Sequence, residues 1–244
     1  MRRIAAGLIV IMSVLLVSCK GKTGNTITVG SDKLDNTQSY FSESMHTVAR
    51  CDTGYYYLDK CGASADNLMF YDDKSEESIV LCNKPQCGHD GEECMAYISG
   101  SEFKSELYYY NSYIYMISSK GNLVQISADG TQRTDLGSIC VLSGQDSVSM
   151  CFNDGYAYVS QEITGDIEGN VTVRLYRFNL DTGSSDKIYE ETGYGIGINS
   201  LKTYGSDTFF LKTSVSKDDK GLYSLEGKGI FRITGEDTEC LLDK

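Results

Sequence analysis

Three cysteines and a histidine lie within thirteen residues of this 244-residue chain, in the segment LCNKPQCGHDGEECMAY. They are Cys82, Cys87, His89 and Cys94, and the single proline of the sequence, Pro85, lies among them. Three thiolates and an imidazole are the ligand set of a tetrahedral structural zinc site with no open position. A structural metal is therefore the first interpretation of the segment.

Disulfides are the second interpretation, because cysteines oxidise in exported proteins. Cys87 and Cys94 would form the easiest bridge, and Cys82 would then pair elsewhere or stay reduced. Free thiols are the third. Under all three interpretations we expect the segment to hold a loop in place.

We expect a different role for most of the remaining cysteines. Cys51 and Cys151 stand at matching places in two repeats, just before a turn. A buried thiol behaves as a small apolar side chain. We therefore expect Cys51, Cys140, Cys151 and Cys240 to be buried in strands.

The chain opens with MRRIAAGLIVIMSVLLVSCKGK, in which two arginines precede an unbroken apolar run from Ile4 to Val17. The run is shorter than the roughly 20 residues that a spanning helix needs, and it is typical of a signal peptide. Its end, Leu-Val-Ser-Cys, resembles a bacterial lipoprotein signal. That resemblance implies a signal peptide over residues 1–18, lipid on Cys19 and a mature protein on the outer face of the cell membrane. An ordinary secretory signal or a short signal anchor is the alternative.

Residues 19–46 are rich in Gly, Ser, Thr, Asn and Asp, a composition typical of a flexible tether. His46, the other histidine of the sequence, lies there and is expected to be solvated. The formal charge of −12 and the isoelectric point of about 4.6 argue against nucleic acid as a partner, since binding phosphates needs a basic face.

Four short aromatic segments resemble one another: GYYYLD, SYIYMIS, GYAYVS and DTFFLK, starting at Gly54, Ser112, Gly155 and Asp207. Each follows a short apolar run and a turn signal, and two further short runs come after it. The unit is thus four strands, and it recurs roughly every 40 to 60 residues. That number of strands at that period is typical of a β-propeller blade.

The sequence therefore predicts an all-β, β-propeller-like domain of four four-stranded blades over residues 47–244. A Cys/His-rich insertion over 82–104 separates blades 1 and 2, and acidic residues from Asp90 predict a short helix toward Ile98. Four blades either close into a small ring or form an open or truncated arc. A β-sandwich or a run of meanders is the competing fold.

The segment LMFYDDKSEESIVLCNKPQCGHDGEECMAY, together with the lipoprotein signal and the YIY…L…DG repeats, resembles a group of uncharacterised lipoproteins from Gram-positive gut anaerobes. Their pattern is a strand ending in Leu-Cys, then Cys-x-His-x4-Cys-x-Ala-Tyr, then propeller-like repeats. The resemblance implies a fold and a location but no reaction. Such proteins commonly carry more blades than the four found in this sequence.

The sequence suggests no catalytic set. Asp181-Thr182-Gly183 looks like an aspartic protease loop, but it occurs once and falls at a predicted turn. Our leading hypothesis is a non-enzymatic, membrane-anchored binding or scaffold module for a protein or a glycan. A hydrolase or lyase acting on envelope glycans is the alternative, and it needs two carboxylates, or a carboxylate and a tyrosine, in one pocket. A metal-binding or redox-sensing surface protein is the second alternative.

Overall fold

The computed structural model describes residues 47–100, 103, 106–165 and 169–243, and this part of the chain is built from β-strands. The predicted signal peptide (1–18), the lipid-bearing Cys19 and the predicted tether with His46 lie outside the described residues. Within the described ranges, no helix has the length and apolar character that a membrane crossing requires.

In the described part of the chain, seventeen strands form four antiparallel sheets, which we number in chain order. The first sheet contains β1 (Val48–Cys51), β2 (Gly54–Lys60), β3 (Ala65–Asp72), β4 (Glu77–Val80) and β5 (Tyr97–Ser99). The second contains β6 (Tyr108–Tyr110), β7 (Tyr113–Ile117), β8 (Asn122–Ser127) and β9 (Arg133–Ser138). The third contains β10 (Ser147–Asn153), β11 (Tyr156–Thr164), β12 (Asn170–Asn179) and β13 (Ser185–Tyr194). The fourth contains β14 (Gly197–Tyr204), β15 (Asp207–Lys217), β16 (Tyr223–Thr234) and β17 (Asp237–Asp243).

Each sheet contains a four-stranded meander in which sequential strands pair, and in the first sheet β5 also pairs with β3. In the third sheet the first turn is Asp154-Gly155, and both residues have positive φ, at 46° and 78°. A two-residue turn with two positive φ angles matches the right-handed twist of the flanking strands, which is why Asp-Gly predicts a hairpin. The order of four strands per repeat, predicted from the aromatic segments, is confirmed.

The cores lie between neighbouring sheets. Leu68 of the first sheet and Ile114 of the second are fully buried in one cluster. Phe152 of the third sheet packs among tyrosines of the second in another cluster, and Phe210 of the fourth sheet packs with Leu175 of the third in the last. Face-to-face stacking of sheets that each carry apolar side chains on both faces is the packing principle of a β-propeller.

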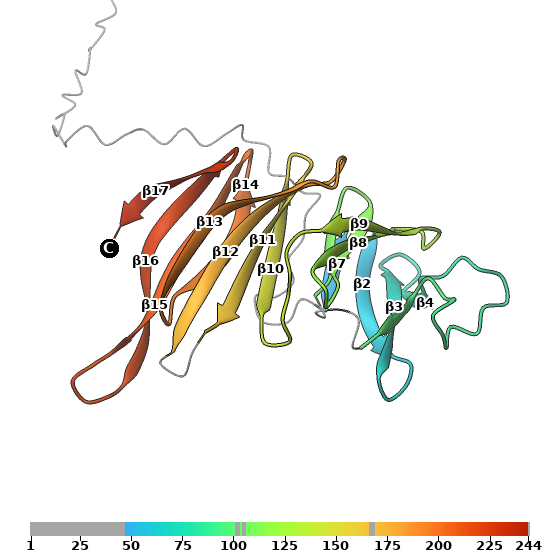
Figure 1. Cartoon of the computed structure of the whole chain (residues 1–244). Coiled ribbons are helices and arrows are strands. Elements are labelled where there is room, and N and C mark those ends of the chain that lie inside the picture. The colour runs from blue at the N-terminus through green and yellow to red at the C-terminus, as the bar shows by residue number, and fades with distance from the viewer. Residues whose placement is uncertain (1–46, 101–102, 104–105, 166–168, 244) are drawn as a thin grey trace, which may run out of the picture.

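The arc of four sheets is open. The first strands of the sheets, β1, β6, β10 and β14, make contact in that order. Figure 1 shows the sheets side by side, with the first sheet at the right and the fourth at the left, and these end sheets do not meet. Of the two predicted outcomes, ring closure or an open arc, the structure has the open, β-propeller-like arc.

The Cys/His segment lies between the first and second sheets, as predicted. The prediction of a short helix from Asp90 toward Ile98 is wrong. The segment forms single turns, such as Cys94 N–H donating to Gly91 O at 2.9 Å, and then enters β5. β5 pairs with Ala65–Asn67 of β3, while β4 pairs with the other half of the same strand, Met69–Asp72. Pairing with β3 satisfies backbone groups that a helix would otherwise have used.

The expectation of buried strand cysteines is correct for Cys51 and Cys151 and wrong for Cys240. Cys51 and Cys151 are 7% and 0% exposed, in β1 and β10. Cys140 is also buried, although it lies just after β9 and not within a strand. Cys240 is exposed because β17 is the outer edge strand of the fourth sheet.

Candidate functional site

Both ends of the Cys/His loop, residues 82–94, are held by one residue of β3. Leu68 O accepts a hydrogen bond from Leu81 N–H at 2.9 Å, just before the loop, and Leu68 N–H donates to Ala96 O at 2.8 Å, just after it. Leu81 and Ala96 are 4% and 0% exposed, within the core between the first two sheets. The loop is therefore clamped onto the sheet at its base.

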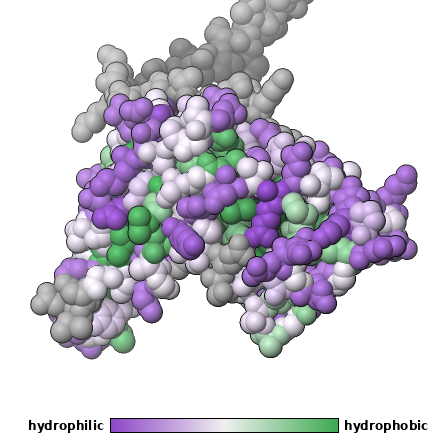
Figure 2. Space-filling model, turned by 45° about the vertical axis from the view of Figure 1, so that its right-hand side comes forward, coloured by the Kyte–Doolittle hydropathy of each residue, from purple (hydrophilic) through white to green (hydrophobic). Residues whose placement is uncertain are grey.

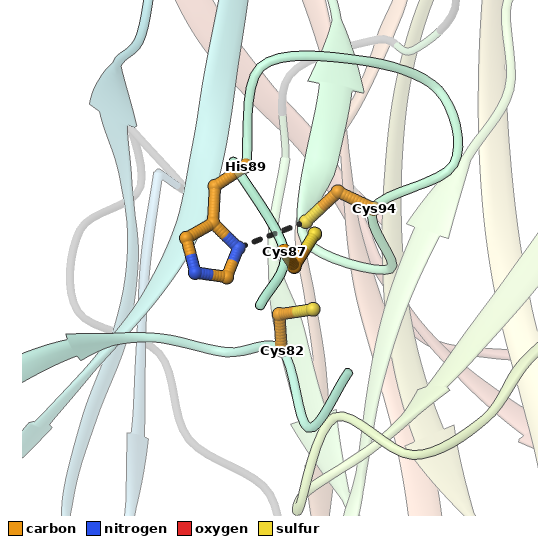
Figure 3. Close-up of side chains that lie close together, drawn as sticks. All are labelled: Cys82, Cys87, His89 and Cys94. Carbon is orange, nitrogen blue, oxygen red and sulfur yellow. Dashed lines mark hydrogen bonds between the residues drawn. The ribbon is translucent and has the colours of Figure 1, made fainter. Parts of the chain in front are cut away.

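Within the loop, turns aim the four side chains at one point. Cys87 N–H donates to Lys84 O at 3.3 Å, and Gln86 and His89 both have a φ of 59°. Left-handed backbone is costly for such residues and persists only where the surroundings determine it. Figure 3 shows the side chains of Cys82, Cys87, His89 and Cys94 converging from different parts of the loop.

The ligand atoms of these four side chains all lie within 4.8 Å of one another. His89 Nδ1 lies 3.3 Å from Cys94 Sγ. Zinc bonds of about 2.3 Å to sulfur and 2.0 Å to nitrogen require such separations in a tetrahedron. Cys94 is 3% exposed and the other three are partly buried, so the cluster can hold a metal ion shielded from solvent.

The thiols differ in acidity. Burial acts to raise the pKa of Cys82, but hydrogen bonds from the Lys84 backbone and from Cys94 and Cys87 outweigh it, so the pKa lies below its ordinary value. Burial raises the pKa of Cys94 to about 11. Thiols bind a metal ion as thiolates, so a cation that enters this cluster replaces their protons.

None of the eight cysteines in the described part of the chain forms a disulfide. A bridge between Cys87 and Cys94 would leave Cys82 and His89 without a role, whereas a metal ion uses all four side chains. Four protein ligands leave no coordination position for a substrate, so the arrangement suits a structural metal and not a catalytic one.

Contact between sheets also partly buries an acid that the sequence did not single out, Glu106. Tyr108 OH donates to the Glu106 carboxylate and accepts from Met150 N–H of β10 at 3.1 Å. Burial raises the pKa of Glu106 to about 7, against the lowering effect of the Tyr108 hydrogen bond. No motif marks Glu106, because its burial depends on the contact between β6 and β10.

The raised pKa predicts a pH dependence of stability. Between about pH 4.5 and 7 the unfolded chain ionises Glu106 before the folded one does, so the folded protein loses stability as pH rises through this window. Glu106→Gln should remove that loss: the variant should be more stable than wild type by on the order of 2 kcal/mol at pH 8 and no more stable at pH 4. Urea denaturation at both pH values measures the difference, and an equal difference at both would contradict the assignment.

A second candidate site lies between the third and fourth sheets, where a cleft of about 440 Å³ opens beside β10 and β14. We call it the interblade cleft. Its polar lining includes Ser147, Ser149, Ser160, Glu162, Asn199 and Ser200. The structure thus places a carboxylate among hydroxyl and amide groups.

Backbone irregularities shape this cleft. The register of β14 and β15 shifts between Asn199 and Lys202, and Ser200 within that bulge has a φ of 53°. A bulge turns side chains away from their regular alternation, and such features gather beside functional sites. The sequence did not predict the cleft, since β10 and β14 lie far apart in the chain.

The described fold and the Cys3His cluster define an open, β-propeller-like protein with a candidate metal centre in a loop. No protein-family model and no curated protein matches the chain. Among solved structures, it is similar to an oligogalacturonate lyase from Vibrio parahaemolyticus, with 8% identity and a TM-score of 0.46 over 82% of this chain and 65% of the lyase.

It is also similar to the tricorn protease, with 11% identity and a TM-score of 0.44 over 76% of this chain and 17% of the protease. A further oligogalacturonate lyase, solved in complex with manganese, has 12% identity and a TM-score of 0.38 over 69% of this chain and 39% of the lyase. The chain thus spans less than two thirds of the length of each of these three proteins.

Proposed function

We propose that this protein is a membrane-anchored, extracytoplasmic binding module without enzymatic activity. The observation that carries the proposal is the interblade cleft, a preformed recess with polar and apolar walls between packed sheets. Ligand sites are concave, largely preformed and shaped by a few converging polar groups. On the face in Figure 2, apolar surface lies in small patches among polar side chains, as suits a domain exposed to water.

Zinc is the metal that fits the Cys/His loop best. Thiolate and imidazole ligands in a tetrahedron favour zinc among the common divalent ions. Cys82, Cys87, His89 and Cys94 would hold the ion, and the ion would fasten a loop whose two ends already meet at Leu68. A redox-sensing role for the same thiols is the competing proposal, and it requires that they oxidise reversibly to a disulfide.

The anchor is proposed from residues 1–19. When the full chain is expressed in a bacterium, it should sediment with the membrane fraction. Protease added to cells from which the cell wall has been removed should cleave it. Cys19→Ser should release the protein into the soluble fraction, because a lipid on the thiol provides the membrane affinity. Membrane association that is equal for both proteins would contradict lipid anchoring.

The binding role is tested with Cys19→Ser protein immobilised on beads. Solubilised envelope proteins and a set of envelope glycans are passed over the beads, and a parallel sample contains a metal chelator. We expect retention of at least one component, because the cleft is formed by core packing and not by ligand. A domain that retains neither protein nor glycan would refute the binding role.

One observation favours the enzymatic alternative, since Glu162 and Tyr108 both line the interblade cleft. A carboxylate and a tyrosine are the minimum for acid–base cleavage of a glycan. Tyr108 OH, however, is already engaged with Glu106 and Met150 N–H. Shortening of any retained glycan during incubation, measured by mass spectrometry, would establish the enzyme in place of the binding module.

A further inference from the structure

The interblade cleft has the chemistry of a site for a polyol. Ser149 Oγ and Ser160 Oγ face each other at 2.8 Å across β10 and β11. Asn199 Nδ2 donates to Thr213 Oγ1 at 2.6 Å on the opposite wall. Ser160 Oγ also donates to Ser149 O at 3.5 Å, and Thr213 Oγ1 donates to Gly197 O at 3.4 Å. The serine pair therefore keeps acceptor positions for a ligand, and the Asn199 amide keeps one N–H donor and its oxygen acceptor.

Glu162 is the carboxylate of this cleft, and its position is fixed by the backbone of the fourth sheet. Its Oε1 accepts from Ile198 N–H at 3.0 Å, and its Oε2 accepts from Ser147 Oγ at 3.5 Å. A carboxylate can accept about four hydrogen bonds, so roughly two positions remain. A ligand that donates hydroxyl protons can take them.

The two charged side chains of the lining, Glu162 and Lys202, carry opposite charges, so the cleft has no net positive charge that would attract an anion. Lys202 is the cation among the lining residues, while Glu162 stands inside and the chain as a whole carries −12. An anionic ligand would bring a like charge toward Glu162, which costs energy in a partly buried site. A neutral ligand avoids that cost.

Apolar side chains supply the remaining wall. Leu201, Leu211 and Leu225 line the cleft beside the hydroxyls, and Leu225 is 66% exposed at its rim. Sugar rings present hydroxyl groups at their edges and C–H groups on their faces, so a wall of this mixed kind can contact both. The volume of about 440 Å³ lies in the range of small-molecule sites.

We propose that the interblade cleft binds a neutral sugar, with Glu162 accepting hydrogen bonds from its hydroxyl groups and the serines of β10 and β11 completing the contacts. This inference rests on the proposed binding role and names its ligand class. A hydrogen bond to a charged group contributes more than one between neutral groups, so Glu162 should dominate affinity.

The test is calorimetric titration of the full chain with cellotriose, maltotriose and chitotriose, and with trigalacturonate as the anionic probe. At least one neutral trisaccharide should bind, and Glu162→Gln should weaken it about tenfold or more, since Gln keeps the shape but loses the charge. Glu77→Gln, in β4 of the first sheet, is the matched control and should leave binding unchanged.

Leu225→Arg provides a second variant, because its exposed side chain can change without disturbing the core and should obstruct the cleft. Tighter binding of trigalacturonate than of any neutral sugar would overturn the proposal. So would the absence of sugar binding at about 10 mM, or binding that neither variant weakens. In those cases the binding role itself still stands if the immobilised protein retains an envelope component, so the two failures are distinguishable.

Discussion

Cys94→Ser should reduce bound zinc from one ion per chain to none. Cys94 is 3% exposed, and its sulfur lies 3.3 Å from His89 Nδ1. A ligand that binds only the folded state adds about 4 kcal/mol when present at a thousand times its Kd. Loss of zinc should therefore lower the midpoint of thermal unfolding by about 10 °C for a chain of this size. Elemental analysis and thermal unfolding, each with and without chelator, measure both effects.

Cys240→Ser is the matched control, since the same change is made at an exposed cysteine on the outer edge of the fourth sheet. It should leave zinc content and unfolding unchanged. Hydrogen exchange adds a local readout: the Leu68 amide, which donates to Ala96 O, should exchange faster once the loop is released. A wild-type protein that contains no zinc but an intramolecular disulfide would contradict the metal assignment.

Phe152→Ala should destabilise the domain by about 3–5 kcal/mol, because it opens a cavity where the second and third sheets pack. Phe152 is fully buried and stacks on Tyr110 with ring centroids 5.1 Å apart. Its ring also lies 4.6 Å from that of Tyr115. Aromatic pairs of this kind add about 1 kcal/mol beyond the burial of area. The unfolding midpoint should fall by about 10 °C or more.

Tyr204→Ala is the control for this prediction, since Tyr204 is 57% exposed and its truncation should change stability by about 0.5 kcal/mol or less. Chemical denaturation gives both values. If the two variants were equally stable, the packing of the third sheet on the second would not be the source of stability that the structure indicates.

The strand order could be predicted because short stretches of sequence are enough to indicate each strand and turn. Asp154-Gly155 between two apolar runs marks a hairpin through backbone geometry alone, and the same pattern recurs around Asn111-Ser112, where both φ angles are positive. Four repeats of such a unit imply four sheets. The expected helix is replaced by turns over residues 90–96, and at its far end Tyr97 and Ile98 pair with β3, a contact between residues about 30 positions apart that no local pattern indicates.

The four side chains of the candidate metal cluster, Cys82, Cys87, His89 and Cys94, were all predicted from the sequence for a similar reason, with a disulfide and free thiols as the alternatives. Cys87, His89 and Cys94 are close in the chain, so their types and spacing already indicated a binding site. Their convergence with Cys82 depends on Leu68, which holds both ends of the loop to one strand. The interblade cleft had no comparable signal, because Glu162 and Asn199 lie on different sheets.

The sequence by itself determined the all-β repeats, the ligand types of the Cys/His loop and the prediction of a lipid anchor at Cys19, since each is encoded in neighbouring residues. Only the tertiary structure decided that the arc stays open, that Glu106 is partly buried beside Tyr108 and that a cleft with polar and apolar walls forms beside β10 and β14. Those features arise where distant strands pack together, and the energy of that packing depends on contacts that no short stretch of sequence contains.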